Sequence, residues 1–292
     1  MKPFSLLFIS IVLTVPTYAQ TPQYCADRKF PPKAVGSYRL KISEIRTQDT
    51  DAEENRCVAS VVTELGSQLV IARDWDLAWL PAVGKDVNGD GLPDAIVEGY
   101  SGGAHCCWTY WFVSLGQPPE VYLKLENERD IAIDTSTPGH TYIRTQDGAF
   151  DYFDGLCHAC TSFPTVILEL QGEVLSDAGW SFVAEYDRDI AKARHEFEYE
   201  DDGEEFAALS KYVPGLGAKY NRAKAAALTV VLAYLYSGRE DQAWQALDAM
   251  WPVNDRARIK DLILNTRAQG ILSQTSTPPP SLQPQPVSAS PE

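Results

Sequence analysis

Short runs that alternate apolar and polar residues dominate the chain between Tyr38 and Leu175, and this alternation predicts β-strands. The runs are rich in Val, Ile, Tyr and Trp, and they are separated by Gly, Pro, Asn and Asp, which favour turns. The predicted strands are YRLKISEIR, RCVASVVTEL, QLVIARDW, DAIVEGY, WTYWFVSL, VYLKLEN and TVILELQG. Their regular spacing predicts an antiparallel β domain over residues 20–180, either a sandwich or a partial, propeller-like array.

The period of the apolar residues changes near Asp187. The run YDRDIAKARHEFE has apolar residues at the spacing of one helix face, and these are Tyr186, Ile190, Ala193 and Phe197. The sequence therefore predicts that a helical segment over residues 181–270 follows the β domain. The fold class predicted is α+β.

From Asn221 the chain predicts three helices. The first is apolar enough to be buried and ends at a turn at Ser237-Gly238. The second is amphipathic and stops before Pro252. The third begins near Asn254 or Asp255, since either side chain is a suitable helix N-cap.

The two ends of the chain differ from the part between them. Residues 1–19 combine Lys2, an apolar run of about a dozen residues and a small residue before Gln20, which predicts a cleavable signal peptide. The alternative is an uncleaved N-terminal anchor. We expect an exported protein, periplasmic or secreted, with no membrane span after the signal is removed. Residues 271–292 consist mainly of Pro, Ser and Gln and predict a disordered tail.

The net charge restricts the class of partner. The chain has 40 Asp and Glu residues against 25 Lys and Arg residues. A nucleic-acid-binding protein needs a basic surface that displaces counterions from phosphates. The composition therefore argues against nucleic-acid binding and mildly favours binding of cations.

The segment DVNGDGLPD contains closely spaced oxygen donors. Side-chain oxygens occur at Asp86, Asn88, Asp90 and Asp94, and the carbonyl of Leu92 can add another donor. Calcium takes six to eight oxygen ligands, and Gly91 permits the sharp turn that such a loop needs. The sequence therefore predicts a calcium site, most simply with a structural role. The alternative is an Asx-rich turn without metal.

This segment resembles the FG-GAP repeat of integrin-α-type propellers, whose pattern D-x-N-x-D-G-x-x-D is followed by an apolar strand. The match covers residues 86–97, and the chain contains no second good copy. The resemblance implies a calcium loop between strands. It does not imply a complete propeller, because that family normally carries several repeats. Val97 stands where a helix-loop-helix calcium hand needs a bidentate Glu.

The cysteines allow three interpretations. An even number in an exported chain predicts disulfides, with one of Cys106 and Cys107 joined to Cys157 or Cys160 and with Cys25 joined to Cys57. Alternatively, His105, His158 and the nearby thiolates bind zinc or copper. A third interpretation is a redox-active CxxC at Cys157 and Cys160. The six cysteines are Cys25, Cys57, Cys106, Cys107, Cys157 and Cys160.

The run LAYLYSGREDQAWQALDAMWP, within residues 224–252, resembles a tetratricopeptide unit. The resemblance implies a helical hairpin that binds a protein partner, whereas an ordinary hairpin packed on the β part would fit the same residues. No nucleophile elbow or phosphate loop is recognisable, so no catalytic residue is predicted. We expect a non-enzymatic, calcium-stabilised binding or scaffold protein; the alternative is a periplasmic enzyme that uses the thiols or a transition metal.

Overall fold

The computed structural model of the chain describes residues 33–44, 57–103, 107–199, 202–214 and 218–276. The predicted signal peptide, Cys25, His105, Cys106 and most of the predicted tail lie outside the described residues. In the part that is described, β-strands come first and helices follow, which confirms the predicted α+β fold.

Within the described residues, twelve strands form three antiparallel sheets of four strands each, and each sheet is a meander of strands consecutive in the chain. The first sheet contains β1 (Lys33–Val35), β2 (Tyr38–Glu44), β3 (Cys57–Thr63) and β4 (Gln68–Asp74). The second contains β5 (Asp76–Trp79), β6 (Asp94–Tyr100), β7 (Trp108–Ser114) and β8 (Glu120–Asn127). The third contains β9 (Ala132–Asp134), β10 (Thr141–Gln146), β11 (Thr165–Gln171) and β12 (Val174–Asp177).

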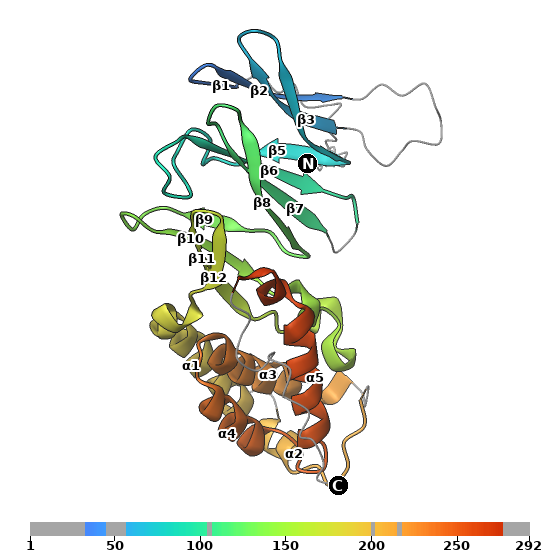
Figure 1. Cartoon of the computed structure of the whole chain (residues 1–292). Helices are drawn as coiled ribbons and strands as arrows, with labels where there is room; N and C mark the ends of the chain where they lie inside the picture. Colours follow the sequence, from blue (N-terminus) through green and yellow to red (C-terminus); the bar gives the residue numbers. More distant parts are fainter. Residues whose placement is uncertain (1–32, 45–56, 104–106, 200–201, 215–217, 277–292) are drawn as a thin grey trace, which may run out of the picture.

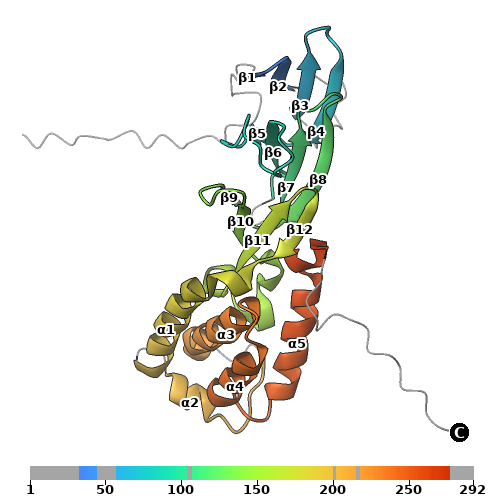
Figure 2. The same cartoon turned by 60° about the vertical axis from the view of Figure 1, so that its left-hand side comes forward.

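The three sheets are stacked, with the helices beneath the third sheet (Figure 1). The turned view shows the same order of layers (Figure 2). Of the two forms predicted from the sequence, the arrangement agrees with a partial array of blade-like sheets rather than with a two-sheet sandwich.

The second sheet is buried on both faces. Ala95 and Val97 of β6 pack with the first sheet, whereas Ile96 belongs to the core shared with the third sheet and the helices. All three side chains are fully buried. This explains the continuous apolar run in β6, because a strand covered on both faces has no polar side.

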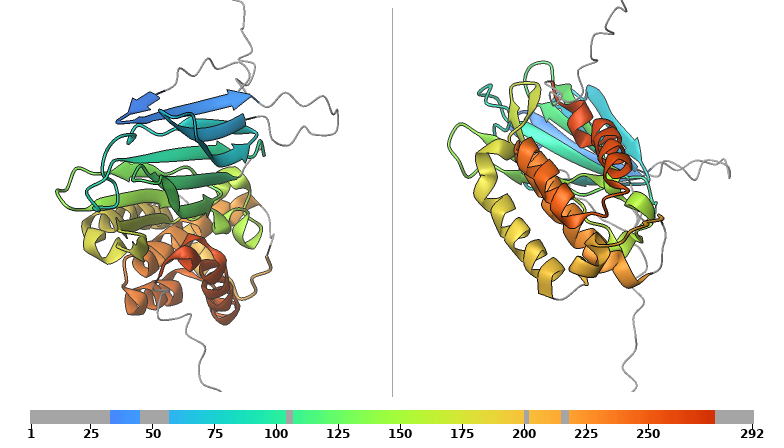
Figure 3. Two further views of the ribbon diagram at one scale, coloured as in Figure 1. Left: turned by 45° about the horizontal axis from the view of Figure 1, so that its top comes forward. Right: turned by 90° about the horizontal axis from the view of Figure 1, so that it is seen from below.

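The helical segment packs directly against the third sheet, so one hydrophobic core continues from the sheets into the helices. Seen from below, the helices lie in front of the sheets (Figure 3). They are α1 (Val183–Tyr199), α2 (Gly203–Ala207), α3 (Asn221–Tyr236), α4 (Glu240–Met250) and α5 (Arg256–Gln269). Within the described ranges, no helix is long and apolar enough to cross a membrane.

The helical prediction was accurate in its register. The buried residues of α1 are the four that the sequence placed on the packing face, Tyr186, Ile190, Ala193 and Phe197. Eleven of the sixteen residues of α3 are buried, as expected for the central helix of the group. Gly238 has a φ of 76°, a left-handed conformation that glycine adopts without strain, and it turns the chain from α3 into α4.

The described chain remains folded beyond the boundary predicted for the tail. Residues Ile271–Gln274 form the short 3-10 helix η7, in which Ile271 and Leu272 are buried. The Gln274 side chain pairs with the backbone of Glu126 at the end of β8, accepting from its N–H at 2.9 Å and donating to its carbonyl at 2.6 Å. The composition of residues 271–292 did not predict this folded segment. Two apolar residues, Ile271 and Leu272, are enough to pack on the existing core.

Candidate functional site

The predicted calcium loop connects β5 to β6 and is held by the core on one side. Val87 is buried in the core, and the carbonyl of Asn88 accepts a hydrogen bond from the N–H of Gly172 at 2.7 Å. Gly172 lies in the turn between β11 and β12. The loop of the second sheet therefore makes a direct contact with the third sheet.

The acidic side chains of the loop accept hydrogen bonds from its own backbone. Asp86 accepts from the N–H groups of Gly89 at 2.7 Å and Gly91 at 2.9 Å. Asp90 accepts from the N–H of Leu92 at 2.7 Å. These are the contacts of an Asx-rich turn. A carboxylate has about four acceptor positions, so the contacts leave lone pairs on Asp86 and Asp90 for a cation.

Two further ligand candidates also face this turn. The Asn88 amide oxygen accepts from the N–H of Asp90 at 3.0 Å, and its Nδ2 donates to Asp90 Oδ2 at 3.1 Å. The side chain of Leu92 is half-exposed and is not part of the hydrophobic core. This is consistent with a position at which only the carbonyl matters.

Asp94 is the unusual member of the loop because its side chain is completely buried. Its Oδ2 accepts from the N–H of Val87 at 2.6 Å and from the N–H of Asn88 at 3.3 Å. Its Oδ1 is buried and has no hydrogen-bond partner in the described part of the chain. A buried carboxylate oxygen without a partner is costly, so this atom calls for a proton or a cation.

The charges around Asp94 also favour a proton or a cation at its carboxylate. The pKa of Asp94 is raised to about 6. Burial is the largest cause and the charges of Asp90 and Asp86 add to it, whereas the two backbone N–H groups act in the opposite direction. Burial and the same three carboxylates also raise the pKa of Tyr122, whose buried hydroxyl has no partner among the described residues. Sequence reasoning missed Tyr122, since it lies on the alternating strand β8 and nothing in the pattern marks it.

A divalent ion would need the donor oxygens of the loop to move closer together than they lie in the structure. No three His, Cys, Asp or Glu side chains in the described residues gather closely enough to hold a metal as they stand. The donor set nevertheless consists entirely of oxygen, which calcium prefers, and it includes the unpartnered Oδ1 of Asp94. The residues therefore fit calcium better than a transition metal, which prefers imidazole and thiolate.

A cavity of about 530 Å³ lies beside the loop. Its lining includes Asp86, Asn88 and Asp90 of the loop, Thr137 and His140 between β9 and β10, and Gln171 at the end of β11. His140, between β9 and β10, has its Nδ1 2.6 Å from Glu169 Oε1. The loop is thus open to solvent on its acidic face and closed on the side of Asp94.

The second candidate site is the cysteine loop between β10 and β11. Cys157 and Cys160 are joined to each other, with Cα atoms 5.0 Å apart. The prediction that one of them pairs with Cys106 or Cys107 is wrong, because the short 3-10 helix η4 (His158–Cys160) brings residues three positions apart within bonding distance. Cys57 and Cys107 are also disulfide-bonded.

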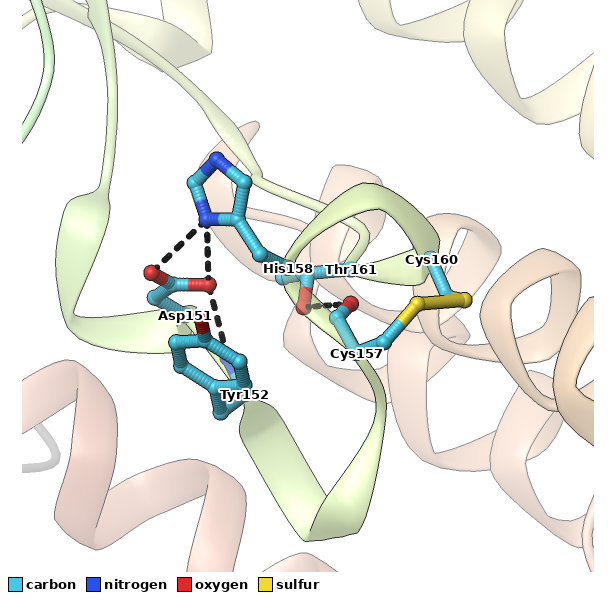
Figure 4. The surroundings of a disulfide bond; sticks show 6 residues. All are labelled: Asp151, Tyr152, Cys157, His158, Cys160 and Thr161. Atoms are coloured by element: carbon cyan, nitrogen blue, oxygen red, sulfur yellow. Dashed lines mark hydrogen bonds and ion pairs between the residues drawn. A yellow bond between two sulfur atoms is a disulfide. The ribbon is translucent and has the colours of Figure 1, made fainter. Parts of the chain in front are cut away.

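His158 belongs to this loop but is turned toward Asp151 instead of toward the sulfur atoms (Figure 4). Its Nδ1 lies 2.9 Å from both carboxylate oxygens of Asp151. In the disulfide state the two sulfurs are not thiolate ligands, so the structure does not bring His158 and the cysteines together as a metal centre.

A buried ionic network holds the cysteine loop on the helices. Asp154 has a fully buried carboxylate that lies 2.7 Å from Lys224 Nζ of α3 and 2.8 Å from an Nη of Arg258 of α5. The Tyr212 hydroxyl also donates to it at 2.6 Å. Burial alone would raise the pKa of Asp154, but these three donors together lower it. Of the two charged residues in α3, Arg222 is exposed and only Lys224 is buried.

Comparison of the chain with protein-family models, with curated proteins and with solved structures finds no match.

Proposed function

We propose that the protein is an exported, non-enzymatic scaffold whose loop at residues 86–94 binds calcium. The observation that carries this proposal is the buried Asp94 Oδ1, which lacks a hydrogen-bond partner and lies among the other acidic groups of the loop. Calcium would be held by Asp86, Asn88, Asp90, Asp94 and the carbonyl of Leu92. Because the loop also contacts the turn at Gly172, the ion would stabilise the second sheet against the third.

In this scaffold, the helical segment would bind the protein partner. The tetratricopeptide-like hairpin consists of α3 and α4, and α3 is enclosed by α1, α4 and β11. A protein partner would therefore meet the outer helices. Two large exposed side chains lie there: Tyr199 at the end of α1 is 74% exposed, and Val253 after α4 is 68% exposed.

The first experiment is thermal unfolding after treatment with a chelator, followed by addition of calcium. Extracellular calcium modules bind with Kd values of about 10⁻⁴–10⁻³ M, so 10 mM calcium should add about 1.4–2.7 kcal/mol to the free energy of unfolding. For a chain of this size we expect Tm to rise by about 3–10 °C. The same concentration of magnesium should produce a smaller rise, because magnesium dehydrates reluctantly.

The control for this experiment is a matched pair of substitutions. Asp94→Asn removes the buried charge but keeps the shape of the side chain, and it should abolish the calcium-dependent rise in Tm. Asp261→Asn makes the same change on the exposed face of α5 and should leave the rise intact. A calcium response that is absent from the wild-type protein, or equal in both variants, would contradict the proposal.

The pKa of Asp94 predicts a dependence on pH. The pKa in the folded state is about 6, above the usual 3.8, so protonated Asp94 favours folding and this contribution is lost as pH rises through 6. In chelator above pH 6, Asp94→Asn should therefore be more stable than the wild-type protein, and in calcium it should be less stable. The rise in Tm on adding calcium to the wild-type protein should shrink between pH 7.5 and pH 5, because protons compete for Asp94. A calcium response that does not change with pH would show that Asp94 is not a ligand.

A further inference from the structure

The Cys157–Cys160 disulfide belongs to the loop between β10 and β11 (Figure 4). Cys157 is exposed, whereas Cys160 is half-buried and packs against the hydrophobic core. The two sulfurs therefore differ in access. An external thiol reaches Cys157 first, and Cys160 is the sulfur that stays with the protein interior.

The bridge is not what holds this turn together. The N–H of Cys160 donates to the carbonyl of Cys157 at 2.8 Å, and the Thr161 hydroxyl donates to the same carbonyl at 3.0 Å. A bond between residues three apart also restricts the unfolded chain very little, since that effect grows with the length of the closed loop. The turn should therefore persist, with its two sulfurs adjacent, when the disulfide is reduced.

The surrounding loop is fixed by contacts that do not involve sulfur. Asp154 is buried against Lys224 and Arg258, and Asp151 contacts the His158 ring. Tyr152 and Asp154 both have positive φ values, 52° and 50°, a backbone conformation that non-glycine residues rarely adopt. Such strain persists only where neighbouring contacts enforce it, and it is common at functional sites.

We propose that Cys157 and Cys160 form an exchangeable disulfide that accepts two electrons from a dithiol on a partner protein. A thiolate of the partner attacks the Cys157 sulfur, a mixed disulfide forms, and Cys160 leaves as a thiolate. A second thiolate of the same partner then attacks the partner sulfur in the mixed disulfide and releases Cys157. The partner loses two electrons and two protons and gains one disulfide, and this chain ends with two thiols.

The structure also indicates where the partner segment lies. A cavity of about 600 Å³ adjoins the disulfide and is lined by Cys160, Phe163, Glu196, Arg222 and Thr229, among others. The lining includes Cys160 but not Cys157, so a partner segment in this cavity would lie beside the leaving sulfur, and the attacking thiol would reach Cys157 from outside the cavity. His158 is turned toward Asp151 (Figure 4), so exchange depends on access to Cys157 and not on a histidine base.

The test mixes the intact, oxidised protein with a reduced synthetic peptide that carries two cysteines. We expect the peptide to be oxidised, up to one disulfide for each chain. Alkylation and mass spectrometry should then show Cys157 and Cys160 as a pair of free thiols, with Cys57 and Cys107 still protected. Circular dichroism of the reduced protein should remain native.

The control is the double variant Cys157→Ser/Cys160→Ser, which keeps the other disulfides and should lose the transfer. The proposal is overturned if the wild-type protein oxidises no peptide, or if the double variant does so equally well. It is also overturned if the bridge opens only when the native circular dichroism is lost, because the bond would then be structural. Should the double variant fail to fold, the alkylation pattern of the wild-type protein still decides between these outcomes.

Discussion

Replacing Lys224 by methionine is expected to lower the free energy of unfolding by about 3–5 kcal/mol, the range found when one partner of a buried ion pair is removed. Methionine fills nearly the same space on α3, so the loss comes from charge and not from packing. The carboxylates of Asp154 and Asp255 would then face the single cation Arg258. Asp154 would keep a negative charge in a side chain that is 1% exposed. Urea unfolding followed by circular dichroism measures this difference.

The matched control is Lys219→Met. Lys219 pairs with Glu205 at the same distance of 2.7 Å, but both side chains are more than half exposed. Water screens such a pair, so the urea midpoint should remain close to that of the wild-type protein. Equal losses in the two variants would contradict a role for buried charge.

The effect of Lys224→Met should also depend on pH. The pKa of Asp154 lies below the usual 3.8, so its stabilising contribution is present above that value and is lost as pH falls below it. The difference between the wild-type protein and Lys224→Met should therefore be largest near neutral pH and should narrow toward pH 3.

The second large effect is expected for Asp147→Ala. Asp147 is fully buried at the start of the cysteine loop and accepts hydrogen bonds from the Tyr236 hydroxyl at 2.6 Å, from the N–H of Ala149 at 3.1 Å and from the N–H of Ile271 at 3.4 Å. Alanine would leave these three donors without a partner, and each such donor costs about 1–3 kcal/mol. We expect a loss of about 3 kcal/mol or more in the free energy of unfolding, measured by urea unfolding.

Two variants locate the cause of this loss. Asp147→Asn keeps the shape and one acceptor oxygen, and it should be milder, because Oδ1 alone accepts from the N–H groups of both Ala149 and Ile271. Asp187→Ala removes an exposed carboxylate on α1 and should have little effect. Hydrogen exchange should show that Asp147→Ala releases the end of α5 and η7 first. Unchanged protection there would contradict the proposed anchoring role of Asp147.

Most of the longer elements could be predicted from the sequence, because their signal is local. The strands β2, β3, β4, β6, β7, β8 and β11 coincide with the predicted runs, and the four buried positions of α1 were identified by their spacing alone. Short elements such as β5 and β9 were missed. Strands of three or four residues carry too few side chains to show a period, and neighbouring strands stabilise them.

The candidate sites, like the secondary-structure elements, could be predicted only where their residues lie close together in the sequence. The oxygen donors of the calcium loop were recognisable because they lie within nine consecutive residues of the sequence. The importance of Asp94 within that set was not, because its burial depends on the sheets that close over it. Asp147 and Asp154 gave no signal at all, since their partners, apart from the N–H of Ala149, lie between 58 and 124 residues further along the chain.

The sequence by itself determined the order of strands and helices, the apolar face of α1 and the composition of the acidic loop, because each follows from residues close together in the chain. Only the tertiary structure decided that Cys157 pairs with Cys160 rather than with Cys106 or Cys107, that one oxygen of Asp94 lacks a partner, and that residues 271–276 belong to the folded part. The physical reason is that hydrophobic periodicity is a local property. Burial, disulfide pairing and the pKa of a carboxylate depend on which distant segments come to lie beside it.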